Sequence, residues 1–244
     1  MSNATVISVI GYNISSELEM KFTNWFDAAY APVHMSTSLY LGIDRYKIIN
    51  GNPVYPETFS IFHCQNLQGV LKTIDNPDRL AVVKDIKTTF KKIDIVWYRK
   101  GFELTKSFRS DRQIEEETCI ENAPVLHLEV LRLSPEQEEK FNDWFVRWAY
   151  RVYIPILMKL PGLKAYNRFH HSGQDFQGSR DYRAQETEYP AYLSMLYFED
   201  VKAFENYERS PELIAFREAI RMNFPGSLDY KWYVQYQLVK SWRK

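Results

Sequence analysis

The chain contains the hexapeptide Lys-Phe-Thr-Asn-Trp-Phe at residues 21–26 and a near copy, Lys-Phe-Asn-Asp-Trp-Phe, at residues 140–145. In both places apolar residues recur at spacings of three and four, which predicts an amphipathic helix with one buried face. Those faces are Phe22, Trp25, Phe26, Ala29 and Tyr30 in the first copy and Phe141, Trp144, Phe145, Trp148, Ala149 and Val152 in the second. The repetition indicates two copies of one structural unit.

The residues around each hexapeptide predict the same order of elements. The first copy has strand patterns at 6–12, 43–49, 57–64 and 93–104, a helix that starts at a capping box of Ser16 and Glu19, and a helix that follows Asn76. Pro32 ends or kinks the first helix. The order β-α-β-β-α-β is that of the ferredoxin-like unit. It begins again with a strand at 125–131 and a helix capped by Ser134.

We therefore expect an α+β fold of two tandem ferredoxin-like repeats with antiparallel sheets. The repeats span 1–109 and 124–244, with a polar linker at 110–123. Later landmarks match between the copies and pair Gly42 with Gly162, Tyr46 with Tyr166, and Ser60 with Ser194. A polar segment at 170–188 has no counterpart in the first copy, and such a loop is either functional, as a lid or partner surface, or mobile.

The composition excludes several classes of function. Thirty-one basic residues balance thirty-one acidic ones, so there is no net field to attract nucleic acid. The chain shows no signal segment and no apolar stretch long enough to cross a membrane. Its two cysteines, Cys64 and Cys119, are expected to be reduced, buried thiols. We expect a cytoplasmic protein. Its aromatic content of 16% favours either a bulky core or a pocket for a flat small molecule.

The helix pattern Phe-x-x-Trp-aromatic, followed by a residue-x-Pro step and a glycine before the second strand, resembles the dimeric α+β barrel superfamily. Within it, the likeness is to EthD-like and antibiotic-biosynthesis-monooxygenase-like proteins. The resemblance implies that two sheets close face to face into a barrel, with helices outside and a small-molecule pocket between the sheet interior and the first helix. One chain could supply both sheets, or each repeat could pair with another protomer in a homodimer.

One residue departs from that resemblance. EthD-like proteins usually have a histidine at the step before x-Pro, whereas this chain has Tyr30-Ala31-Pro32 and Tyr153-Ile154-Pro155. A tyrosine is a poor general base at neutral pH because its pKa is about 10, but it can donate a hydrogen bond to a developing oxyanion.

The strand at 125–131 carries the candidate catalytic pair, His127 and Glu129. If Leu126, Leu128 and Val130 face the helices, alternation sends His127, Glu129 and Leu131 to the barrel interior. The first copy has Ser8 and Ile10 at the equivalent positions, so the fold does not require the pair. His127 could act as a base oriented by Glu129, or the two could be a structural polar pair.

The candidate substrate-binding residues are Tyr153, Tyr166, Arg168, Tyr233 and, in the first copy, Tyr30. If their faces also line the barrel, the second half could bind an anionic or phenolic ligand. Alternatively, Arg168 is a surface residue and the tyrosines belong to the core.

These residues favour a small-molecule-binding protein or a cofactor-independent oxygenase, cyclase or isomerase that acts on an aromatic or polyketide-like compound. The alternative is a non-catalytic binding or assembly protein of the same fold. A haem protein of chlorite-dismutase type is a minor alternative, which would need a proximal histidine facing an apolar cavity. No motif predicts a metal site or a cofactor, because the sequence has no glycine-rich phosphate loop and its histidines lack metal-ligand spacing.

Overall fold

A computed structural model describes residues 4–49, 55–68, 76–90, 93–110, 118, 123–131, 133–175, 191–226 and 230–244. The first half consists of β1 (Val6–Asn13), α1 (Ser16–Trp25), the π-helical segment η1 (Phe26–Tyr30), α2 (Ala31–Ser36), β2 (Tyr40–Ile48), β3 (Thr58–Cys64), α4 (Pro77–Thr89) and β4 (Asp94–Arg109). The second half consists of β5 (Val125–Leu131), α5 (Pro135–Trp144), the π-helical segment η2 (Phe145–Tyr153), α6 (Ile154–Leu157), β6 (Leu163–Asp175), β7 (Tyr192–Phe198), α7 (Val201–Glu208), α8 (Pro211–Asn223) and β8 (Tyr230–Arg243). The two predicted β-α-β-β-α-β units are both present.

The strands of the described residues form one closed antiparallel barrel in the order β1-β3-β2-β8-β5-β7-β6-β4. The halves meet where β2 pairs with β8 and where β4 pairs with β6. Strands β4 and β8 each pair with their own half along one edge and with the other half along the opposite edge. The barrel therefore closes within a single chain, a point that the sequence left open.

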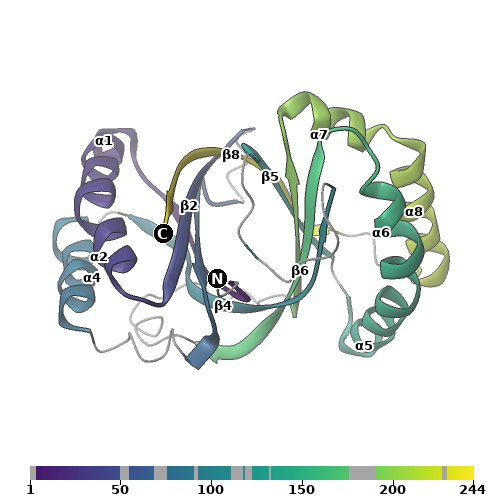
Figure 1. Ribbon diagram of the computed structural model, residues 1–244, viewed down its shortest axis with the longest axis horizontal. Helices are drawn as coiled ribbons and strands as arrows, with labels where there is room; N and C mark the ends of the chain where they lie inside the picture. The colour runs from purple at the N-terminus through teal and green to yellow at the C-terminus, as the bar shows by residue number, and fades with distance from the viewer. Residues whose placement is uncertain are drawn as a thin grey trace.

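The helices cover the barrel on two opposite sides, with α1, α2 and α4 on one side and α5 to α8 on the other (Figure 1). Within the described residues the buried apolar side chains form three layers: one inside the barrel and one beneath each group of helices. The interior layer draws residues from both halves, as expected for a barrel of this size, which side chains fill. No helix in the described part of the chain is long and apolar enough to cross a membrane.

Pro32 does not end the first helix, which was one of the two outcomes expected of it. Pro32 lies in the first turn of α2 and Pro155 in the first turn of α6, and in both copies a π-helical segment precedes the proline. The Ala31 N–H donates to the Phe26 carbonyl, five residues back. The wider π turn accommodates a residue that has no N–H and that would clash with a carbonyl in a regular α-helix.

Helix capping agrees with the sequence in the second copy and differs in the first. Ser134 and Gln137 form the predicted capping box. In the first copy Ser15, rather than Ser16, is the N-cap, and its side chain makes no capping hydrogen bond. Glu19 forms an ion pair with Lys47 instead.

The predicted loop at 170–188 begins as regular structure, because β6 continues to Asp175. Its remainder lies outside the described residues, as do most of the predicted linker at 110–123 and the second cysteine, Cys119. Cys64 is a buried free thiol, as predicted.

Candidate functional site

His127 and Glu129 face the helices, not the barrel interior as expected. Leu126, Leu128 and Val130 instead belong to the interior layer, together with residues of the first half. The expectation failed because both faces of β5 are buried, one inside the barrel and one beneath the helices. Aliphatic residues on one face therefore do not show which of the two sides that face is on. The closed barrel requires the aliphatic residues inside, and the polar pair lies beneath α7 and α8.

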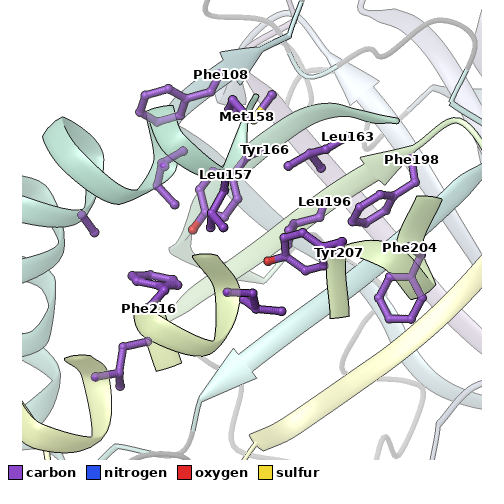
Figure 2. Packing of buried hydrophobic residues seen from close by; sticks show 14 of the residues in the cluster. Phe108, Leu157, Met158, Leu163, Tyr166, Leu196, Phe198, Phe204, Tyr207 and Phe216 are labelled. Carbon is purple, nitrogen blue, oxygen red and sulfur yellow. The ribbon is translucent and has the colours of Figure 1, made fainter. Parts of the chain in front are cut away.

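The other candidate residues of the second half show the same reversal. Val234 packs inside the barrel, so the neighbouring Tyr233 points outward, where its ring lies 4.3 Å from that of His127. Tyr166 belongs to the layer beneath the helices, as Figure 2 shows, and Arg168 shares its face of β6. The grouping of these residues was predicted, but on the wrong side of the sheet.

A cavity of about 50 Å³ lies between the outer face of the sheet and helices α5 and α8. Its apolar wall contains Leu131, Leu133, Phe141, Phe145, Leu213, Phe216 and Ile220. Its polar wall contains Glu129, Glu138, Tyr166, Arg168, Tyr192, Ser194 and Tyr230. This is space for about three or four water molecules, so a ring compound enters only when surrounding side chains move.

The Arg168 side chain is the largest buried polar group of this cavity, with 1% of the residue exposed. Its guanidinium lies 4.2 Å from the ring centroid of Phe145 and 4.3 Å from that of Tyr192. Among the described residues, no acceptor hydrogen-bonds to Nη1 or Nη2. The alternative that Arg168 is a surface residue is therefore wrong, and among the described residues this buried cation has no ion-pair partner.

Glu129 is the residue of the candidate catalytic pair that lines the cavity, and His127 lies behind it. Nε2 of His127 lies 3.2 Å from Oε1 of Glu129 and donates to it, since a carboxylate can only accept. His127 is fully buried, between the rings of Phe204 and Tyr233. Glu129 is thus the group that can meet a ligand, and His127 holds it in place.

A second polar cluster supports His127 from the helix side. The Tyr233 hydroxyl donates to Glu208, and Arg217 donates both to Glu208 at 3.0 Å and to the Tyr233 hydroxyl at 2.5 Å. Sequence reasoning missed Arg217 and Glu208. A signal was available for Arg217, because it lies four residues after Leu213 on a helix whose buried residues are Leu213, Phe216 and Ile220.

The tyrosines of the site are proton donors. Burial raises the pKa of Tyr166 far above its ordinary value of 10, although the charge of Arg168 lowers it in part. Burial and the charge of Glu129 raise the pKa of Tyr230 and of Tyr233 in the same direction. The Tyr166 hydroxyl lies 2.8 Å from the Ser194 hydroxyl. These phenols stay neutral at physiological pH and can donate to an oxyanion.

The two tyrosines of the residue-x-Pro steps lie elsewhere. Tyr153 does not line the cavity, but its ring stacks on Phe216 of the cavity wall at 5.1 Å. Tyr30 is buried in the first half beside Phe26, and its carbonyl accepts a hydrogen bond from Nδ1 of His34. The structure does not bring Tyr30 to the second-half site. Within the described residues no group of three or more His, Cys, Asp or Glu side chains could hold a metal ion.

Strand pairing identifies the first-copy counterpart of Arg168. Arg45 pairs across β2–β3 with Ser60, and Arg168 pairs across β6–β7 with Ser194. Ser60 and Ser194 in turn oppose the equivalent positions Ile10 and Glu129. Arg45 and Arg168 are therefore equivalent.

The landmark pairing of Tyr46 with Tyr166 is wrong. Tyr46 packs inside the barrel, whereas Tyr166 faces the helices. The second copy has extra residues in η2, before Tyr153-Ile154-Pro155. Equivalent residues of β2 and β6 are therefore further apart in number than equivalent residues of α1 and α5.

Three solved structures share this fold along nearly the whole chain. A protein from Fusobacterium nucleatum proposed to be a monooxygenase is 11% identical with a TM-score of 0.62, over 100% of this chain and 96% of that chain. An anthrone oxidase-like protein is 13% identical with a TM-score of 0.62, over 100% of this chain and 94% of that chain. A chlorite dismutase variant from Candidatus Nitrospira defluvii is 7% identical with a TM-score of 0.56, over 98% and 92% respectively. Neither a family model nor a curated protein matches the sequence.

Proposed function

We propose that this chain, which has the dimeric α+β barrel fold within a single polypeptide, binds a small organic molecule in the second-half cavity and removes a proton from it through Glu129. The observation that carries the proposal is the Glu129 carboxylate on the cavity wall, fixed by the buried Nε2–H of His127 at 3.2 Å. The first copy has isoleucine and serine at these positions, so the pair has no role common to both copies.

The cavity supplies the groups that such a reaction needs. Glu129 accepts the proton, and His127 keeps the carboxylate oriented toward the ligand. The neutral hydroxyls of Tyr166 and Tyr230, on the same wall, donate to the ligand oxygen on which negative charge develops. The aromatic and aliphatic wall holds the flat body of the ligand and excludes water.

Removal of a proton beside a carbonyl or on a phenol begins several cofactor-independent reactions. The resulting enolate or phenolate can isomerise, cyclise or react with dioxygen at carbon. The likeness in fold to an anthrone oxidase-like protein and to a proposed monooxygenase supports the oxygenase class, with an aromatic or polyketide-like substrate.

The test starts with a search for bound small molecules by native mass spectrometry, followed by oxygen uptake with anthrone and related phenols. We expect Glu129→Gln to lower turnover about 100-fold, the lower end of the range for loss of a general base. Glu136→Gln on the exposed face of α5 is the matched control and should leave turnover unchanged. Full turnover in the Glu129 variant would exclude it as the base.

A non-catalytic binding protein is the second candidate. It is favoured by the residue-x-Pro steps, where Tyr30 is buried in the core and Tyr153 packs against Trp148 and Phe216, so neither can act as a base on a cavity ligand. Binding of a compound without any turnover in the assays above would select this candidate.

The haem alternative does not fit the described residues. A haem iron of this type needs a proximal histidine, and no histidine lines this cavity. His127 is directed toward Glu129 rather than into the open space.

A further inference from the structure

We infer that the ligand of the second-half cavity carries a carboxylate or a similar planar oxyanion, and that Arg168 binds it. This inference rests on the function proposed above and adds the chemical class of the ligand. It comes from comparing the two copies of the repeat, which provide an internal reference for what an arginine at this position does in the absence of a ligand.

In the first copy the arginine is neutralised by the chain itself. Nη1 of Arg45 lies 2.9 Å from Oδ1 of Asp27 in η1. Its guanidinium also lies 5.1 Å from the ring centroid of Phe26 and 5.6 Å from that of Trp242. The buried arginine between these aromatic rings is thus paired with a carboxylate of the same chain, Asp27, which compensates its charge.

In the second copy the arginine and the aromatic ring remain, but the carboxylate is gone. Phe26 and Phe145 contact the equivalent arginines, and counted forward from them Asp27 corresponds to Val146. Segment η2 has nine residues against five in η1, so counted back from the prolines Asp27 corresponds to Tyr150. Neither residue of the second copy is a carboxylate. Val146 is 41% exposed, so no packing requirement explains the loss of a polar residue there. Arg168 has kept its charge, because a guanidinium does not lose its proton in proteins.

No other carboxylate of the described residues replaces Asp27. Glu129 and Glu138 line the same cavity, but neither forms an ion pair with Arg168 among the described contacts. Phe145 and Tyr192 lie close to the guanidinium, at 4.2 and 4.3 Å, and among the described residues no acceptor lies within hydrogen-bond distance of its terminal nitrogens. The Tyr150 hydroxyl interacts with Arg168, but it stays neutral because burial raises its pKa, so it does not replace the carboxylate. Two terminal nitrogens in one plane match the two oxygens of a carboxylate.

The cavity is therefore polarised, with one cation and two carboxylates on its polar wall. The negative group of a ligand is attracted to Arg168 and repelled by Glu129 and Glu138. This fixes the orientation of the ligand and leaves its uncharged part against the aromatic wall and the Glu129 carboxylate.

The experiment compares benzoate with benzamide, which differ in charge but hardly in shape, by ligand-observed NMR titration of the whole protein. We expect benzoate to bind at least ten-fold more tightly than benzamide. Val146→Asp should lower benzoate affinity at least ten-fold, because the new carboxylate takes the role for Arg168 that Asp27 has for Arg45. It should leave benzamide affinity unchanged.

Val152→Asp is the matched control and should not alter either affinity. Val152 was expected on the buried face of the helix, but it is 43% exposed and lies in the same π-helical segment. Equal affinity for the two probes, unchanged in Val146→Asp, would overturn the anion inference while the cavity still binds a small aromatic molecule. Wild-type protein that binds neither probe at millimolar concentration would contradict the proposed function itself, and the inference with it.

Discussion

At the scale of single residues, the two arginines show how one side chain serves two purposes. Arg45 is held between aromatic rings and paired with Asp27, which also binds Lys240 at 2.7 Å. Arg168 has the aromatic contacts without the carboxylate. The second arrangement lowers the free energy of unfolding, because an uncompensated buried charge is unfavourable, whereas in the first the Asp27 carboxylate offsets that cost.

Replacement by methionine should therefore have opposite effects at the two positions. Arg45→Met removes one of the two cationic partners of Asp27, which keeps Lys240, and we expect it to lower the free energy of unfolding by about 1 kcal/mol. Arg168→Met removes an unpaired charge and keeps the apolar stem, so we expect a gain of about 1 kcal/mol. Urea denaturation followed by circular dichroism measures both. Destabilisation of equal size at both positions would show that Arg168 has a structural partner.

At the scale of elements, the junctions between the halves carry matching polar groups. Asp44 on β2 accepts hydrogen bonds from Ser241 and forms an ion pair with Arg243, both on β8. At the opposite junction, Asn167 on β6 accepts from Ser107 and Arg109 of β4 at 2.9 and 2.8 Å. His63 contacts Asp44 and the Thr118 hydroxyl, each at 2.8 Å, and Asn167 donates to the Thr118 carbonyl at 3.4 Å, so these bonds connect the two junctions. Both junctions are thus fixed in register by buried hydrogen bonds.

The Asp44 junction should make stability depend on pH. Burial alone would raise the pKa of Asp44, but His63, Arg243 and Ser241 together hold it below its ordinary value of 3.8. A lowered pKa means that the ionised carboxylate adds stability at pH values above 3.8, and that this contribution is lost as the pH falls below it.

Asp44→Asn should consequently lower the free energy of unfolding by about 3 kcal/mol at pH 7, and the difference from wild type should shrink as the pH falls below 4. Denaturation curves between pH 7 and pH 3 measure the difference. Glu205→Gln, at an exposed carboxylate of α7, serves as the control and should give a small difference that does not change in this way. A difference for Asp44→Asn that is independent of pH would contradict the assignment.

The sequence predicted the elements well and their faces less well. Capping at Ser134 and Asn76, together with helical periodicity, located α5 and α4. The face of β5 could not be predicted, because both sides of the strand are buried and its alternation of Leu126, His127 and Leu128 fits either orientation. Arg168 and Tyr166 line the second-half cavity, although they were expected inside the barrel, and Tyr30 does not line it.

At the scale of the whole molecule, the barrel joins the halves so closely that neither has a complete core. The interior layer combines Ile7, Val9 and Phe59 of the first half with Leu128 and Met195 of the second. Closure within one chain was not predictable, because pairing between distant strands leaves no local pattern in the sequence. Each half taken alone would expose one apolar face of its sheet.

Separately produced halves, residues 1–109 and 124–244, should therefore fail to remain folded monomers. We expect each to aggregate or to self-associate when alone, because its interior face is uncovered. Co-expression should yield a one-to-one complex that size-exclusion chromatography with light scattering resolves. A half that stays monomeric and cooperatively folded would show that the barrel interior contributes little to stability.

Closure of the barrel by one chain also removes a constraint on its evolution. In a homodimer every substitution appears twice, so a change that opens a ligand site in one subunit opens it in the other, and the stability lost is doubled. Here Val146 can differ from Asp27, and Glu129 from Ile10, without any change in the opposite half. The first repeat can therefore stay a self-neutralised scaffold while the second accumulates the unpaired and buried polar groups that recognition requires.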